Sequence, residues 1–234
     1  MIANICLSYI GGLTFKILAV IMRFDMSKAE IITFIIAMLA ITNPIGNMAI
    51  FAGLTGDKTL KEKRHSALIA GVAILIILII VTWSGDLILK AFGIDIASFE
   101  TAGGLIIALM GLSMLHAKTS GIHHSKDEAE DAKTKTSVAV VPIAIPLVAG
   151  PGAITTIVVN THSYPTLEDK VIISVVSIAI GLTLWIAFYF SAPISKLLGV
   201  SGINIVTRIM GIILTAIAFG MMASGFRQLF PGLT

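Results

Sequence analysis

Six long runs of the chain contain no Asp, Glu, Lys or Arg, and this pattern limits what the chain can fold into. The runs are 31–56, 66–85, 101–117, 136–167, 171–195 and 209–226. A helix that crosses a bilayer needs about 20 apolar residues, and its backbone polar groups must be paired within the protein. Only 12% of the residues are charged, about half the fraction in an average soluble domain. The sequence therefore predicts an all-α integral membrane protein with six transmembrane helices in the lipid bilayer.

The N-terminal segment, residues 1–26, departs from this pattern. It is apolar, but Lys16 and the pair Gly11-Gly12 interrupt it. A signal peptide is disfavoured, because the start carries no positive charge and no A-x-A cleavage site follows. An interfacial helix, an extra span and a leader upstream of a start at Met26 all stay open, and we favour a peripheral segment.

Lys and Arg are concentrated in two loops. Residues 57–65 hold three lysines and an arginine, and the charged linker 118–137 holds four further lysines. Short loops rich in Lys and Arg stay in the cytoplasm, so we expect both loops inside the cell and the C-terminus outside. Lys16, Arg23 and Lys28 argue mildly against this orientation. The expected location is the cytoplasmic membrane, as a multi-pass protein.

The chain aligns with itself at a shift of about 107 residues. Pro44 then falls on Pro151, and residues 104–107 fall on 211–214. Apolar helices resemble one another at many shifts, but here one shift serves all three helices of each half. The expected units are repeat 1 at 27–117 and repeat 2 at 138–234. Because three spans is an odd number, the second repeat is inverted, as in secondary transporters with broken helices at the midplane.

The first run contains a break at Asn43-Pro44. Proline inside a helix removes a backbone donor and costs about 3 kcal/mol, and the residue before it is pushed away from helical dihedrals. Asn is a favoured N-cap, and Pro suits the first helical position. The sequence thus predicts a helix that ends near Thr42 and a second helix that begins at Pro44.

The fourth run has a matching break at Gly150-Pro151. A restarting helix exposes N–H groups, which attract negative charge, and the helix before it exposes carbonyls, which attract a cation. Neither break contains an ionisable residue, so a zwitterion fits the two ends. The alternative is a pair of proline kinks closed by neighbouring helices. The candidate substrate-binding residues are Thr42, Asn43, Gly46, Asn47, Gly150, Gly152, Thr155 and Thr156.

The stretches NPIGN at 43–47 and PIAIPLVAGPGAIT at 142–155 resemble two motifs of the MarC family. This family includes the SnatA-type small neutral amino-acid transporters and is placed in the LysE-like transporter superfamily. The resemblance runs from about Ser27 to Gly225. It implies six spans, two inverted repeats and proton-coupled transport of amino acids such as glycine and alanine.

Two ionisable residues lie near the starts of equivalent spans, Glu100 in the third and Arg208 in the sixth. Charged residues at membrane depth are costly and mark function by default. The two residues are therefore candidates for coupling or gating. They could pair across the repeat interface, with Glu100 as the coupling proton site, or both could lie at the headgroup level. We expect Asp86 and Asp95 to be solvated.

The sequence favours a secondary transporter that works by alternating access. A channel or exporter for another small polar solute would also need polar breaks at the midplane, and it stays open. An intramembrane enzyme would need a nucleophile with a base, or metal ligands, and the chain has no HExxH and no GxSxG. We expect no catalytic residue, cofactor, metal or nucleic-acid partner. The expected partners are a small neutral amino acid and a coupling proton or cation, and the oligomeric state is not predicted.

Overall fold

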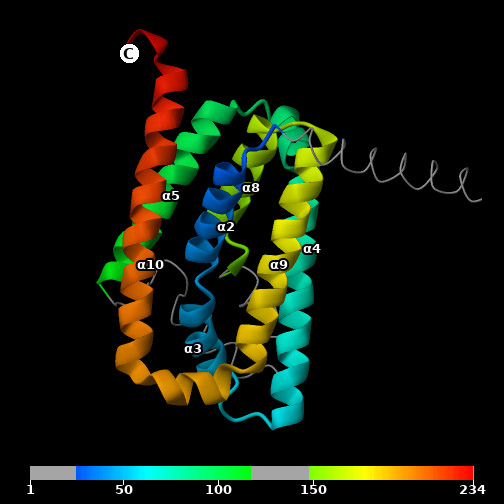
Figure 1. Cartoon of the computed structure of the whole chain (residues 1–234), viewed down its shortest axis with the longest axis vertical. Helices are drawn as coiled ribbons and strands as arrows, with labels where there is room; N and C mark the ends of the chain where they lie inside the picture. The colour runs from blue at the N-terminus through cyan, green and yellow to red at the C-terminus, as the bar shows by residue number, and fades with distance from the viewer. Residues whose placement is uncertain (1–24, 117–147, 234) are drawn as a thin grey trace, which may run out of the picture.

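The computed structural model describes residues 25–116 and 148–233, and every regular element in these ranges is helical. Figure 1 shows the helices packed side by side along one long axis. The expectations for residues 1–24, for the linker 118–137 and for residues 136–147 of the fourth run lie outside the described residues. The elements are α2 (Lys28–Thr42), α3 (Pro44–Leu54), α4 (Leu60–Phe92), α5 (Ile96–Leu115), α8 (Pro151–Ser163), α9 (Leu167–Tyr189), α10 (Ser191–Leu229) and the 3-10 turn η1 (Pro231–Leu233).

Five of the predicted spans are confirmed as helices long and apolar enough to cross a membrane. The broken helix α2–α3 forms one of them, Lys28–Leu54, and α4, α5, α9 and α10 form the others. Of the predicted fourth span, the structure describes the second half, which is α8. The all-α fold with several apolar membrane helices is thus confirmed.

The boundary between the fifth and sixth predicted spans is wrong. The fifth helix ends at Tyr189, and α10 begins at once at Ser191 and runs to Leu229. Gly199 bends α10 with φ 61° and ψ 178°, a conformation that favours glycine. The segment before the bend crosses the lower end of the bundle in Figure 1, and the segment after it rises to the C-terminus. Lys196, which follows the fifth run directly, therefore lies within α10.

Local signals fix where the helices begin. The side chains of Ser27 and Thr59 accept hydrogen bonds from the N–H groups of Glu30 and Glu62, whose carboxylates bond back to the cap residues. These are capping boxes, which satisfy two otherwise free N–H groups at each helix start. Asp95 caps α5 through the N–H of the third helical residue. Each of these helix starts is therefore determined by four neighbouring residues of the sequence.

The helices α4 and α9 form one antiparallel pair. Trp185 packs on Gly71, and Leu75 packs on Gly181, so the contact runs up one helix as it runs down the other. A β-carbon at Gly71 would lie 2.8 Å from the Trp185 β-carbon. Small residues of this kind let membrane helices approach closely.

The helices α5 and α10 form a second antiparallel pair. Met222 packs on Gly104, and the Gly111 and Gly211 backbones are in direct contact: a β-carbon on either would lie 2.9 Å from the carbonyl oxygen of the other. Because neither position has room for a side chain, these glycines fix the spacing of the two helices.

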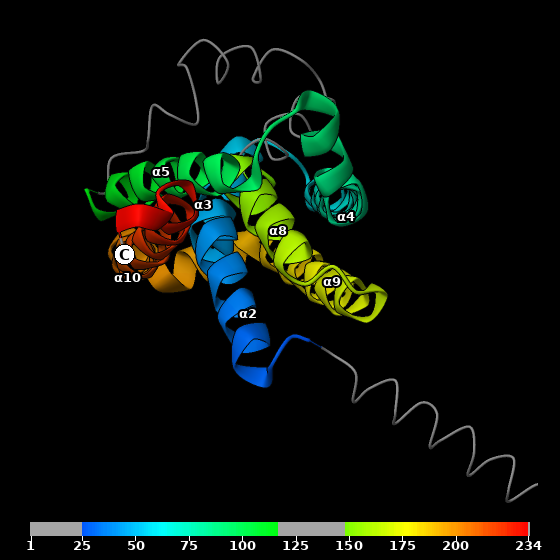
Figure 2. The same cartoon turned by 90° about the horizontal axis from the view of Figure 1, so that it is seen from above.

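The broken elements lie between these pairs. The helix α3 contacts α9 and α10, whereas α8 contacts α4 and α5. In the view of Figure 2, α2 lies between α8 and the α5–α10 pair. Fully buried side chains from four helices meet here, among them Met38, Ile107, Ile157 and Leu184. The exposed Ile, Leu and Phe side chains cover the outer faces, as expected where lipid replaces water.

The two ends of the bundle differ in charge. The upper end in Figure 1 holds the starts of α2, α5 and α9 and the ends of α4, α8 and α10. We name it the acidic end because its acidic residues outnumber its basic ones: Asp25, Glu30, Asp86, Asp95, Glu168 and Asp169 against Lys28, Lys90, Lys170 and Arg227. The opposite, basic end carries Lys58, Lys61, Lys63, Arg64 and Lys196. It includes the loop 57–65 that we expect in the cytoplasm.

Candidate functional site

Asn43 turns the chain between α2 and α3. Its backbone is left-handed, with φ 36° and ψ 67°, which Asn tolerates better than most residues that carry a side chain. Its N–H donates to the Leu39 carbonyl at 3.0 Å, and its Oδ1 accepts a hydrogen bond from the Gly46 N–H at 3.2 Å. The predicted helix end at Thr42, the N-cap at Asn43 and the restart at Pro44 are confirmed.

Asn47 closes the rest of this break. Its Nδ2 donates to the Thr42 carbonyl at 2.7 Å, and its N–H donates to the Asn43 carbonyl at 3.0 Å. The Thr42 hydroxyl donates to the Met38 carbonyl at 2.7 Å. All three polar side chains are buried. The first break is therefore closed in large part, and the closing groups come from the break itself rather than from neighbouring helices.

The second break has an extended cap residue in place of the left-handed one, and it lacks the closing side chains. Gly150, with φ −72° and ψ −176°, is the N-cap of α8, and no side chain bonds to the helix start. The Ile154 N–H donates to the Gly150 carbonyl at 3.2 Å. Within the described ranges, no group accepts a hydrogen bond from the N–H groups of Gly152 and Ala153. The start of α8 thus presents unpaired N–H groups, and groups of this kind attract an anion.

Two threonines follow this open end within the first two turns of α8. The side chains of Thr155 and Thr156 are buried, each 3% exposed. Thr155 packs on Gly103 of α5, where a β-carbon would lie 2.6 Å from its Oγ1. The Thr156 Oγ1 is buried with no hydrogen-bond partner in the described part of the chain. A buried hydroxyl without a partner costs stability, so it needs an explanation such as a bound ligand or water.

The two breaks face each other across the middle of the bundle. A β-carbon on Gly152, in the first turn of α8, would lie 3.3 Å from Ile41 Cγ2 in the last turn of α2. From α5, Ile107 Cγ1 and Met110 Sδ would lie 3.1 and 3.6 Å from the same point. The structure thus brings the end of α2 and the open start of α8 together. Apolar side chains border this meeting point and leave little room at position 152.

Glu100 and Arg208 do not pair. Glu100 is 6% exposed, and its Oε2 accepts a hydrogen bond from Gln228 Nε2 at 3.0 Å. Arg208 is exposed on α10, 20 residues before Gln228, which corresponds to about 30 Å along a helix. The alternative in which they pair is wrong because α5 and α10 are antiparallel, so their N-terminal parts lie at opposite ends of the bundle.

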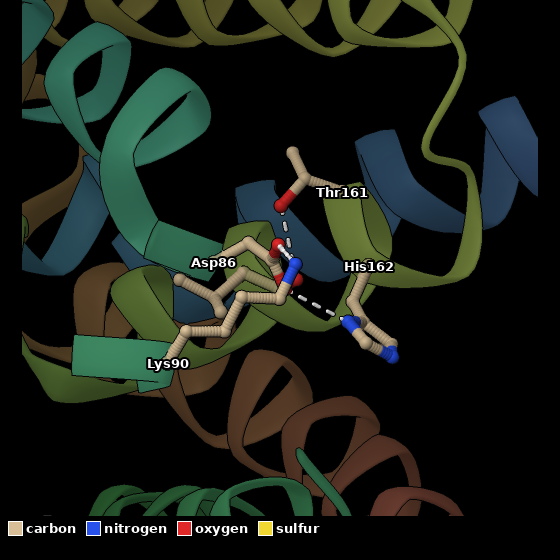
Figure 3. Close-up of polar contacts among 5 residues, drawn as sticks. Asp86, Lys90, Thr161 and His162 are labelled. Atoms are coloured by element: carbon tan, nitrogen blue, oxygen red, sulfur yellow. Dashed lines mark hydrogen bonds and ion pairs between the residues drawn. The ribbon is translucent and has the colours of Figure 1, made fainter. Parts of the chain in front are cut away.

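A polar contact at the acidic end was not foreseen (Figure 3). Asp86 near the end of α4 accepts hydrogen bonds from His162 Nδ1 at 2.9 Å and from Lys90 Nζ at 2.6 Å. Asp86 is 28% exposed, so its expected solvation is only partial. The sequence held a weak signal for this contact, since His162 is the only His within the last two turns of the fourth run.

Taken together, the fold and the two facing breaks define a helical, multi-pass membrane protein. The MarC family model, described as a MarC family integral membrane protein, matches residues 28–230. The chain therefore belongs to the MarC family.

Curated relatives agree with this assignment. A UPF0056 membrane protein of Pyrococcus horikoshii is 39% identical over 193 residues, which cover 82% of this chain and 92% of the relative. UPF0056 membrane protein YhcE of Escherichia coli is 34% identical over 200 residues, or 86% and 93% of the two chains. UPF0056 membrane protein YvbG of Bacillus subtilis is 35% identical over 202 residues, or 85% and 95%. No solved structure matches the chain.

Proposed function

We propose that this MarC protein is a secondary transporter of a small neutral amino acid of the glycine and alanine class. It works by alternating access across the cytoplasmic membrane, coupled to a proton or another cation, as in the SnatA-type members of the LysE-like superfamily. The observation that carries the proposal is the uncapped start of α8, which faces the end of α2 at the middle of the bundle. The proposal needs neither a cofactor nor a catalytic residue.

The two helix ends suit the two charges of an amino acid. The free N–H groups of Gly152 and Ala153, with the hydroxyls of Thr155 and Thr156, are hydrogen-bond donors for a carboxylate. At the end of α2 the Leu39 and Thr42 carbonyls are already paired. The carbonyls of Ala40 and Ile41, which have no partner in the described part of the chain, are the acceptors for an ammonium group. The apolar side chains around Gly152 favour a substrate with a very small side chain. Asn43, Gly46 and Asn47 would then act mainly by shaping the end of α2, and Gly150 by leaving the start of α8 open.

An inverted repeat of six spans supports alternating access. The helices α3 and α8 both begin at proline, α4 and α9 both begin at leucine, and the members of each pair begin 107 residues apart. The contacts obey the same relation, since α3 packs against α10 as α8 packs against α5. In such repeats the substrate site lies at the interface of the two halves, near the midplane.

The direct test is counterflow of labelled glycine and alanine in proteoliposomes, with pH and sodium gradients imposed separately. Gly152→Leu should abolish counterflow, because the added side chain would overlap Ile41 and Ile107. The control is Gly220→Leu, at an exposed position with nothing within 4 Å, which should transport normally.

Two results would count against the proposal. If well-folded Gly152→Leu protein transported glycine as the parent does, the site would lie elsewhere. Flux that never saturates with substrate, and that no ion gradient drives uphill, would favour the channel for another small solute. If the protein transported another solute saturably and did not transport glycine or alanine, the secondary-transporter mechanism would stand and the proposed substrate class would be rejected.

A further inference from the structure

The start of α4, at the basic end, carries positive charge where a helix favours negative charge. Lys61, Lys63 and Arg64 lie in its first two turns together with one carboxylate, that of Glu62. The N-terminus of a helix is the positive end of its dipole, so cations there are unfavourable without an anion nearby. The Glu62 Oε2 is already engaged, since it accepts hydrogen bonds from the N–H and the hydroxyl of Thr59, at 2.8 and 2.7 Å. The surplus positive charge at this helix start is therefore available to an anion from outside the helix.

The matching helix start in the second half has the opposite charge. At the shift that aligns Pro44 with Pro151, Lys61 falls on Glu168 and Arg64 falls on Val171. The first turn of α9 is acidic, which suits the helix dipole. The positive patch is thus a property of α4 alone and does not follow from the repeat.

An aromatic ring, rather than a carboxylate, holds Arg64 in place. The guanidinium carbon of Arg64 lies 4.7 Å from the centre of the Tyr189 ring, at the end of α9. Within the described ranges, the Arg64 side chain forms no ion pair and no hydrogen bond. A guanidinium stacked on a ring keeps its N–H groups free at the edge, in the fork geometry that fits a phosphate. The stack therefore fixes the guanidinium and leaves its donors available to a ligand.

Further aromatic side chains surround the stack. The centroid of the Tyr189 ring lies 6.0 Å from that of Trp185 and 4.9 Å from that of Phe190. Tyrosine and tryptophan are enriched in membrane proteins at the level of the lipid headgroups. Because the cluster lies at the basic end of α9, it puts the Arg64 guanidinium at the expected depth of the headgroups.

Apolar side chains next to the stack face outward. On α4, Leu68 lies one turn after Arg64 and is 47% exposed. On α9, Ile186 lies one turn before Tyr189 and is 49% exposed. Exposed apolar side chains on membrane helices contact the acyl chains of the lipid. A positive site at headgroup depth and a surface for acyl chains therefore adjoin each other on the α4–α9 pair.

We propose that the Arg64–Tyr189 stack binds the phosphate of an anionic phospholipid, whose acyl chains lie against the outer faces of α4 and α9. Lys61, exposed one turn before Arg64, adds a second positive charge. Basic sites between membrane helices bind headgroups of this kind. A zwitterionic lipid has the same phosphate but carries its own ammonium group, so the positive charge here favours a headgroup with net negative charge. This lipid site is independent of the proposed transport function.

The chain contains its own fluorescent reporter for this lipid. It has two tryptophans, Trp185 beside the stack and Trp83 toward the acidic end of α4. In a Trp83→Phe background, quenching of the Trp185 fluorescence by lipids with brominated acyl chains measures which lipid occupies the site. The protein is reconstituted in phosphatidylcholine with increasing brominated phosphatidylglycerol, and in phosphatidylglycerol with increasing brominated phosphatidylcholine. The two series together give the relative affinity of the site for the two lipids.

Phosphatidylglycerol should bind beside Trp185 about tenfold more tightly than phosphatidylcholine. Arg64→Gln should remove most of this preference, because an amide has neither the charge nor the fork of the guanidinium. The matched control is Arg227→Gln, at an exposed arginine of the acidic end, which should leave the preference unchanged. In a Trp185→Phe background, Trp83 should report no preference, which separates the site from general attraction of the protein to anionic lipid.

A second pair of variants tests the ring. Tyr189→Phe keeps an aromatic face under the guanidinium and should keep the preference, whereas Tyr189→Leu releases Arg64 and should lower it about threefold. A parent protein without any preference, or an unchanged preference in Arg64→Gln, would overturn the proposal. If neither brominated lipid quenched Trp185, protein would cover this face, as in an oligomer, and the lipid site would be rejected.

Discussion

The two breaks occupy equivalent places in the fold but differ in how their backbone groups are paired. At the first break, Asn43 accepts from the start of α3 and Asn47 donates to the end of α2. At the second, Gly150 has the backbone of an N-cap but no side chain, and the start of α8 is open. A break closed by its own side chains can be rigid, whereas an open one must find its partner elsewhere. Under the proposed function, this difference makes the second break the main place for ligand binding and the first break its support.

Among the variants that test the difference between the two breaks, Asn47→Ala should have the largest effect. Asn47→Ala leaves the Thr42 carbonyl buried without its donor, and we expect a loss of about 2 kcal/mol of stability. Thermal unfolding in detergent measures it. The control is Asn160→Ala, whose Nδ2 donates to the Thr156 carbonyl within α8, and which should cost less than about 0.5 kcal/mol. Equal costs for both variants would mean that Asn47 does not close the first break.

A capping side chain like that of the first break can be introduced at the second. Gly150 has φ −72° and ψ −176°, close to the N-cap Thr59 at −67° and 158°, so a serine there can cap α8 without strain. The Gly150→Ser hydroxyl would accept from the free N–H groups and compete with the ligand. We expect binding of glycine or alanine to weaken about tenfold, or ~1.4 kcal/mol, by calorimetry on purified protein.

The matched control for this variant is Gly150→Ala, which adds a side chain of similar size without an acceptor. It should bind more tightly than Gly150→Ser while sharing any steric effect. Equal weakening in both variants would show that bulk, and not capping, is responsible, and the start of α8 would lose its assigned role.

Much of this contrast was predictable from local sequence. The breaks at Asn43-Pro44 and Gly150-Pro151 were predicted correctly because proline and a capping residue act within one turn. The sequence also pointed to an unequal pair, since Gly150 carries no side chain to cap with. The hydrogen bond from the Asn47 amide to the Thr42 carbonyl was not predicted, because nothing in the pattern NPIGN shows that this amide turns back to Thr42. Contact of Asn47 with a ligand stays a prediction.

The remaining errors concern partners that are far apart in the chain. One alternative paired Glu100 with Arg208 by repeat position, but antiparallel packing of α5 and α10 gives Glu100 the partner Gln228, 128 residues away. Asp169 is buried and accepts a hydrogen bond from the Met26 N–H, 143 residues earlier in the chain, and no local pattern announces this contact. Periodicity and spacing describe each helix alone, and they do not specify which charged groups a three-dimensional packing brings together.

The smallest expected effect is that of replacing Asn43, and it tests what the Asn43 side chain contributes. Its left-handed backbone suits glycine, so Asn43→Gly loses only the capping hydrogen bond to Gly46. This variant should lose about 0.5 kcal/mol of stability. Asn43→Ala loses the same cap and also forces a β-carbon into the left-handed region, which adds about 1 kcal/mol. The gap between the two variants, measured by thermal unfolding, separates backbone strain from capping. If Asn43→Gly lost as much stability as Asn43→Ala, the Asn43 side chain would contribute more than a capping hydrogen bond. Direct contact with a ligand would then be the favoured role of this side chain.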